Sequence, residues 1–238
     1  ENTTWELVRD IETLKNHLSI SSWTIFGGSW GSTLALSYAI SYPNSCDNLV
    51  LRGIFMLRQK EIDWFYQEGC SKIYPDAWEK FIAPIPVDER DNLVKAYYKK
   101  LTSKNESEKS EAARAWSVWE ASTSKLIPDP KQIQDFGEDK FAIAFARIEC
   151  HYFINHGFFD EENYLLNRID KIRHLPCTIV QGRYDVVCPP ESAWELSKAW
   201  PEANLKIVQD AGHSASEVGI INHLVNATDQ IVKLKEIN

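Results

Sequence analysis

Hydrophobic and polar residues along the first 54 positions alternate between a helical and an extended pattern. Over residues 4–18, apolar side chains recur at every third or fourth position, which predicts an amphipathic helix. The segment 22–27 is rich in β-branched and aromatic residues and predicts a strand, and residues 48–54 predict a second strand. Between them, residues 32–42 predict a second helix that stops before Pro43. This alternating order indicates a doubly wound parallel sheet of the α/β class.

The pattern changes after Phe55, and strand signals nearly vanish as far as about Asn163. Helical runs are predicted at 61–70, 88–102, 106–124 and 138–155. Four of the nine tryptophans fall in this stretch, namely Trp64, Trp78, Trp116 and Trp119. We therefore expect an inserted, all-helical cap over residues 56–163.

The alternation returns toward the end of the chain. The predicted elements are a strand at 177–182, a helix at 190–200, a strand with its following loop at 204–212 and a closing helix at 219–235. Residues 1–55 and 164–238 are therefore expected to form one α/β core, which the helical cap interrupts.

The overall charge argues against two classes of partner. The chain has 26 Lys and Arg against 34 Asp and Glu, which gives a net charge of −8, and it has no basic tract. Such a protein is a poor partner for nucleic acid or for anionic membranes. No run of 18 or more apolar residues occurs, so no transmembrane helix is expected.

Five cysteines occur, an odd number, and no two of them form a C-x-x-C pair. This predicts free thiols in a reducing compartment, hence a cytoplasmic protein, with neither a disulfide framework nor a zinc site. The chain opens without an initiator methionine and without a visible signal peptide. We therefore expect its natural N-terminus to lie outside this sequence.

The segment GGSWG at 27–31 matches the pattern G-x-S-x-G of a nucleophile elbow. In such an elbow a serine sits on a strained turn between a strand and a helix, and small residues are needed two positions before and after it. The turn exposes the hydroxyl of Ser29. It also aims the backbone N–H of Trp30 at a developing oxyanion. A plain glycine-rich turn is the alternative, but a predicted strand before it and a helix after it favour the elbow.

A serine hydroxyl needs a base, and the base needs a carboxylate that orients it. In the elbow architecture the order is Ser, then Asp or Glu, then His, each following a strand. Asp185 follows the strand 177–182, and His213 follows the strand 205–208. Of the rival acids, Asp210 is too close to the strand of the histidine and Glu191 opens a helix. A metal cluster is not expected, since the acidic, cysteine and histidine residues of 149–156 fall on different helix faces.

Several longer segments together resemble the proline iminopeptidases of the α/β-hydrolase superfamily. They are FGGSWGSTLALSYAISYP, LRGIF, WSVWEAS, RIECHYFINHGFF, QGRYDVVCPP and AGHSA, and they span essentially the whole chain in register. Trp30 after the nucleophile and the segment IECHYF separate this family from general esterases. The resemblance implies an α/β-hydrolase fold with an inserted helical cap. It also implies release of N-terminal proline from peptides, without metal or cofactor.

The resemblance further implies which residues bind substrate. Recognition of a free amine is attributed in the family to cap glutamates, which match Glu120 and Glu149 here. A peptide α-amine has a pKa of about 8, so its charge would relieve the repulsion between two carboxylates. From the residues alone, each glutamate would be expected on a solvated helix face. Other implied substrate-binding residues are Arg52, Phe55, Trp64 and Cys188.

One departure from the family pattern precedes the nucleophile. The family carries an upstream H-G-G-P-G loop, which supplies a second oxyanion N–H, and then a D-Q-R-G-x-G-x-S segment; neither occurs here. We expect a chain that starts after the first strands of the sheet, as a fragment or a truncation. Loss of one oxyanion donor costs about 10²–10³ in rate, so impaired catalysis is one expectation.

Two other hypotheses stay open at this point. The first is another ester or amide hydrolase, because the same fold carries many such enzymes and a fold does not determine a substrate. The second is a non-catalytic binding protein or an impaired fragment. The missing loop favours this second hypothesis, and the complete set of Ser29, Asp185 and His213 argues against it. The sequence does not reveal the oligomeric state.

Overall fold

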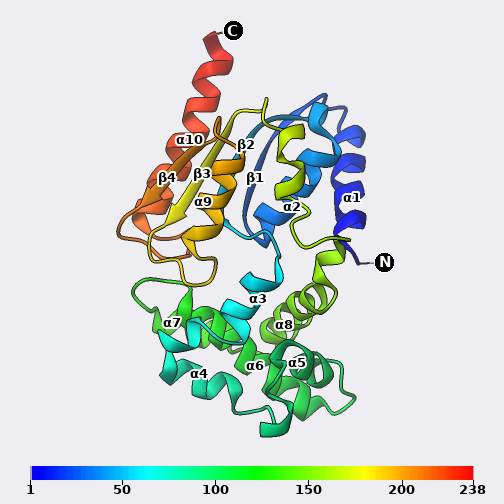
Figure 1. Ribbon diagram of the computed structural model, residues 1–238, viewed down its shortest axis with the longest axis vertical. Coiled ribbons are helices and arrows are strands. Elements are labelled where there is room, and N and C mark those ends of the chain that lie inside the picture. Colours follow the sequence, from blue (N-terminus) through cyan, green and yellow to red (C-terminus); the bar gives the residue numbers. More distant parts are fainter. Residues whose placement is uncertain (1, 238) are drawn as a thin grey trace. The chain divides into compact units, whose positions relative to one another are not determined.

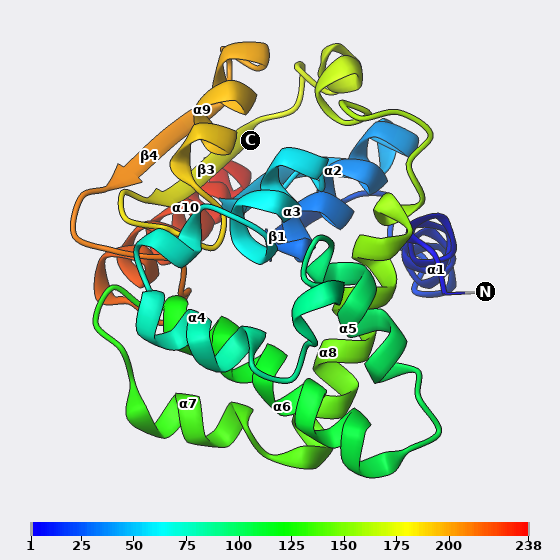
Figure 2. The ribbon, with the colours of Figure 1, turned by 60° about the horizontal axis from the view of Figure 1, so that its bottom comes forward.

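A computed structural model describes residues 2–237. The chain divides into two compact units, one formed by residues 1–58 with 158–238 and the other by 59–157. Figures 1 and 2 show the elements of both units. Short 3₁₀ helices join the longer elements; they are η1 (Pro43–Ser45), η2 (Cys70–Lys72), η3 (Val87–Glu89), η4 (His156–Phe158) and η5 (Leu166–Lys171). Among the described residues, no helix is long and apolar enough to cross a membrane.

The first unit is built on a parallel sheet with the strand order β1-β2-β3-β4 (Figure 1). The strands are β1 (Trp23–Ser29), β2 (Cys46–Ile54), β3 (Cys177–Gly182) and β4 (Asn204–Val208). All four predicted strands are confirmed. Because the strands are parallel, the residues that follow their carboxyl ends gather at one edge of the sheet.

Helices cover both faces of this sheet. They are α1 (Thr4–His17), α2 (Trp30–Ser41), α9 (Pro190–Ala199) and α10 (Val218–Ile237). Leu49 and Leu51 of β2 join the core under α2 and α9, whereas Val50 joins the core under α10. Burial on both faces explains the nearly continuous apolar run of β2. The predicted doubly wound sheet is confirmed.

The second unit is entirely helical within the described residues. Its helices are α3 (Gln59–Tyr66), α4 (Pro75–Ile82), α5 (Leu93–Leu101), α6 (Glu106–Thr123), α7 (Pro130–Phe136) and α8 (Asp139–Ile154). The long helices α6 and α8 pack side by side (Figure 2). Aromatic side chains form much of the core, where the rings of Phe81 and Tyr97 stack with centroids 4.8 Å apart. The sequence pattern predicted no helix at α4 or α7.

Candidate active site

Ser29 ends β1 and immediately precedes α2, with backbone angles φ 57° and ψ −128°. A positive φ at a residue other than glycine is strained, as expected of a nucleophile elbow. A Cβ atom on Gly27 would lie 2.2 Å from the carbonyl oxygen of Gly31, so the turn requires glycine at this position. A Cβ on Gly31 would meet no atom within 4 Å, so an alanine, which is also small, fits at this position. The backbone carbonyl of Gly31 is what crowds Gly27.

Asp185 and His213 form a hydrogen-bonded pair at the same edge of the sheet. Asp185 lies in the turn after β3 and His213 in the loop after β4, and both are buried. Nδ1 of His213 is 2.8 Å from Oδ2 of Asp185. The other carboxylate oxygen accepts hydrogen bonds from the backbone N–H groups of Val187 and Cys188 at 3.1 and 2.8 Å. The carboxylate is held from two sides and can orient an imidazole base.

The second imidazole nitrogen of His213 faces Arg52. Nη1 of Arg52 lies 3.1 Å from Nε2 of His213 and donates a 3.0 Å hydrogen bond to the carbonyl oxygen of His213. A guanidinium can only donate, so Nε2 accepts and the ring proton lies on Nδ1, toward Asp185. No hydrogen bond joins Ser29 Oγ to His213 among the described residues. The structure therefore pairs Asp185 with His213 and places Ser29 at the end of β1 without the serine–histidine contact.

Two supporting residues escape the sequence patterns. Gln181, at the end of β3, donates to Oδ2 of Asp185 at 3.0 Å and to the carbonyl oxygen of Cys188 at 2.9 Å. Gly53 in β2 has φ +54°, and a Cβ there would lie 2.9 Å from Cε1 of His213. The sequence signals that could have pointed to these residues are a glutamine at the end of an apolar strand, for Gln181, and a glycine inside an apolar strand, for Gly53. Neither reveals its partner until the order of the strands is known.

The remaining predicted residues of this unit follow the carboxyl ends of β1, β2 and β3. Trp30 is the first residue of α2, so its N–H belongs to the helix N-terminus. Phe55 is buried just after β2, where its backbone N–H donates to Oγ of Ser32 at 3.1 Å and its carbonyl accepts from Thr33 at 2.6 Å. Cys188 is buried beside the Asp185 turn.

In the helical unit, the two predicted amine-binding glutamates share one network. The hydroxyl of Tyr66 on α3 donates to Oε1 of Glu120 on α6. Nε1 of Trp116 donates to Oε2 of Glu149 on α8 at 2.9 Å. Burial raises the pKa of Glu149 well above its usual value, and the charge of Glu120 adds to that rise. The expectation of a solvated helix face is wrong for Glu120, which is buried. Glu149 is half-buried, and its carboxylate accepts the hydrogen bond from Trp116.

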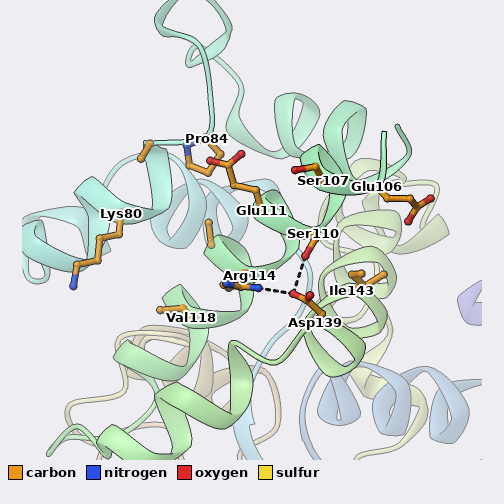
Figure 3. A pocket seen from close by; sticks show the side chains of 12 residues that line it. Lys80, Pro84, Glu106, Ser107, Ser110, Glu111, Arg114, Val118, Asp139 and Ile143 are labelled. Carbon is orange, nitrogen blue, oxygen red and sulfur yellow. Dashed lines mark hydrogen bonds and ion pairs between the residues drawn. The ribbon is translucent and has the colours of Figure 1, made fainter. Parts of the chain in front are cut away.

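Trp64, the last substrate-binding residue predicted in the helical unit, lies on α3, and a cavity occurs elsewhere in this unit. Trp64 packs on Gly69, where a Cβ would lie 2.4 Å from the indole. A cavity of about 840 Å³ is lined by residues of α6 and α8 together with Lys80 and Pro84 (Figure 3). Inside it Arg114 points at Asp139 and donates a 2.7 Å hydrogen bond to it. No predicted site residue lines this cavity.

Comparison with known proteins identifies the family to which the chain belongs. A family model described as the alpha/beta hydrolase fold matches residues 1–220. A probable proline iminopeptidase from Leptolyngbya boryana is 59% identical over 235 residues, which is 99% of this chain and 73% of that protein. The chain belongs to the proline iminopeptidase family of α/β hydrolases. A second family member, the proline iminopeptidase of Arabidopsis thaliana, is 58% identical over 98% of this chain and 62% of its own length. The chain therefore spans between 62% and 73% of these two relatives.

Solved structures share the family fold at much lower sequence identity. An α/β-fold hydrolase from Bacillus anthracis has a TM-score of 0.62 at 20% identity, covering 95% of this chain and 74% of that one. An esterase from Exiguobacterium antarcticum has a TM-score of 0.59 at 18% identity, covering 98% of this chain and 73% of that one. At such identities the likeness concerns the fold, and the predicted α/β-hydrolase fold is confirmed.

Proposed function

We propose that the protein is a serine aminopeptidase that releases N-terminal proline from peptides through an acyl-enzyme on Ser29. The observation that carries the proposal is the pairing of Asp185 with His213, which leaves Nε2 of the imidazole as a proton acceptor. Ser29 occupies its strained turn at a strand end of the same sheet. The names of the family members support proline as the released residue.

In the proposed reaction, Oγ of Ser29 attacks the carbonyl carbon of the N-terminal proline while Nε2 of His213 takes the hydroxyl proton. Asp185 stabilises the imidazolium that forms. The backbone N–H of Trp30, at the N-terminus of α2, stabilises the negative charge on the carbonyl oxygen. His213 then gives its proton to the leaving amine, and water hydrolyses the prolyl ester of Ser29 in a second step.

Glu120 and Glu149 are the proposed recognition groups for the ammonium of the substrate. Two desolvated carboxylates destabilise each other when both are charged, so a bound cation relieves that repulsion. This role makes the helical unit the cap that selects substrates with a free N-terminus. Phe55, Trp64 and Cys188 are the proposed apolar contacts of the pyrrolidine ring.

The test measures p-nitroaniline release from L-proline p-nitroanilide by the protein and by two serine variants. Ser29→Ala is expected to lower kcat by about 10³-fold or more, because it removes the nucleophile. Ser41→Ala removes an exposed hydroxyl at the other end of α2 and is expected to leave the rate unchanged. Equal rates for Ser29→Ala and the unmodified protein would refute the proposal.

A general esterase is separated from an aminopeptidase by substrates without a free amine. The proposed enzyme is expected to prefer proline p-nitroanilide over its N-acetylated form, because only the former carries the ammonium. Rapid turnover of p-nitrophenyl acetate, combined with indifference to Glu149→Gln, would instead indicate a general hydrolase. Labelling of Ser29 by a fluorophosphonate reports whether the serine is activated, independently of any substrate preference.

A further inference from the structure

Arg52 is a cation that forms no ion pair within residues 2–237. Both of its hydrogen bonds go to His213, one to Nε2 and one to the backbone carbonyl. Its Nε atom is buried and has no hydrogen-bond partner. The side chain as a whole retains partial exposure, so a ligand can reach it. Gly28 makes room for the guanidinium, because a Cβ there would lie 2.5 Å from Nη2.

Asp185 is the acid whose charge acts on Arg52, but its carboxylate already accepts hydrogen bonds from other groups. Asp185 acts on Arg52 only through longer-range attraction, while desolvation lowers the pKa of the guanidinium. Both oxygens of Asp185 accept hydrogen bonds from other groups, namely His213, Gln181 and the backbone of Val187 and Cys188. A partly buried cation without a direct anionic partner carries an uncompensated desolvation cost. An anion brought by the substrate would compensate it.

The position of Arg52 relative to His213 indicates where that anion lies on the substrate. In the proposed reaction, Nε2 of His213 protonates the leaving nitrogen, which belongs to the residue after proline. Nη1 of Arg52 is 3.1 Å from that same Nε2. In a dipeptide, a single carbon separates the leaving nitrogen from the terminal carboxylate, so the carboxylate falls within reach of the guanidinium.

We propose that Arg52 binds the terminal carboxylate of Pro-Xaa dipeptides and makes them the preferred substrate class. This inference rests on the proposed aminopeptidase function and specifies its leaving group. In the absence of substrate, Arg52 donates to Nε2 of His213 and occupies the lone pair that Ser29 needs. A carboxylate gives the guanidinium an anionic partner and releases Nε2 to accept the serine proton. A dipeptide therefore gains both in binding and in activation of the base.

The test compares L-prolyl-L-alanine with L-prolyl-L-alanine amide, which differ only in the terminal charge. The expected result is a kcat/KM about 10- to 100-fold higher for the acid, the range typical of a charge-assisted hydrogen bond. Leaving-group chemistry works in the opposite direction, because the carboxylate makes the departing amine more basic. Equal values for the two substrates, or a preference for the amide, overturn the proposal. Failure to cleave either substrate or proline p-nitroanilide overturns the aminopeptidase function itself.

Variants then assign the preference to Arg52. Arg52→Gln is expected to reduce the acid-to-amide ratio to about one or below, because only the leaving-group effect remains. Arg52→Lys is expected to retain part of the preference, because a cation remains. The matched control is Arg183→Gln, which removes an exposed arginine after β3 and is expected to preserve the ratio. An unchanged acid-to-amide ratio in a folded Arg52→Gln protein would overturn the proposal, because another residue would then bind the carboxylate.

Discussion

The indole N–H of Trp116 donates a 2.9 Å hydrogen bond to Oε2 of Glu149, and the ring of Trp116 stacks on Tyr66 with centroids 4.2 Å apart. Tyr66 in turn donates to Glu120. Two stacked aromatic rings thus hold one carboxyl group each. Despite these donors, desolvation and the charge of Glu120 raise the pKa of Glu149 well above its usual value. The charged form of Glu149 is therefore disfavoured by burial and by the neighbouring Glu120.

Replacing Glu149 should stabilise the fold while impairing the site. A carboxyl group whose folded pKa exceeds its unfolded value lowers stability above the unfolded pKa, about 4.3, and has no such effect below it. Glu149→Gln keeps an acceptor for Trp116 and is expected to raise Tm at pH 7 by about 2–4 °C. At pH 4 the gain should vanish. Calorimetry at both pH values measures the change in Tm. In the kinetic assay, KM for proline p-nitroanilide should rise about tenfold, because the variant loses the negative charge that binds the substrate ammonium. The exposed Glu79→Gln is the control, and an equal gain at pH 4 would contradict the explanation.

Tyr66→Phe isolates the hydroxyl that holds Glu120. The ring and its stacking on Trp116 are kept, so the expected loss concerns the placement of the carboxylate. We expect KM for proline p-nitroanilide to rise about tenfold with a smaller change in kcat, because a lost hydrogen bond to a charged group is worth about 1.5–3 kcal/mol. Fluorophosphonate labelling of Ser29 should stay unchanged. Tyr98→Phe, a partly exposed tyrosine on α5, is the matched control. A fall in the labelling rate of Ser29 would indicate general disruption instead.

Local patterns were sufficient to predict the elements that carry Ser29, Asp185 and His213. Each of these residues follows a short strand, and the order of nucleophile, acid and base along the chain narrows the choice. The strands β2 and β3 are predictable because burial on both faces demands nearly unbroken apolar runs. For the same reason the bounds of β3, residues 177–182, agree with the prediction.

Relationships that depend on strand order or on helix packing could not be predicted. Arg52 meets His213 across 161 positions of sequence, which depends on β2 lying next to β3 and β3 next to β4 in the sheet. Gln181 looks like any polar residue at the end of a strand until its three hydrogen bonds are seen. Glutamate on a helix is usually solvated, and only the packing of α3, α6 and α8 brings Tyr66 to Glu120 and Trp116 to Glu149.

Gln181→Met tests whether the buried amide positions the acid. The substitution preserves side-chain length but removes the donor to Asp185 and the acceptor for the backbone N–H of Ile54. Each buried group left without a partner costs about 1–3 kcal/mol, so Tm should fall by several degrees. A positioning role further predicts a drop in kcat of about tenfold or more at nearly constant KM, since the base loses its alignment. Gln209→Met, an exposed glutamine after β4, should change neither quantity. A loss of Tm with unchanged kcat would leave Gln181 a purely structural residue.

Alanine substitutions at two glycines separate backbone strain from the glycine pattern of the elbow. Gly53 has φ +54°, and a Cβ there would lie 2.9 Å from Cε1 and 3.0 Å from Nδ1 of His213. Gly53→Ala is therefore expected to strain β2, displace the imidazole and lower kcat by about 10²-fold, since misplacement by about 1 Å has that effect on catalysis.

Gly31 belongs to the five-residue elbow motif, yet a Cβ there meets nothing within 4 Å and its φ is negative. Gly31→Ala should retain kcat and raise stability by about 0.5–1 kcal/mol, because alanine favours the helix over glycine. Steady-state kinetics with proline p-nitroanilide and thermal denaturation measure both effects. Inactivation by Gly31→Ala together with tolerance of Gly53→Ala would show that the motif, rather than the contact with His213, determines where glycine is required.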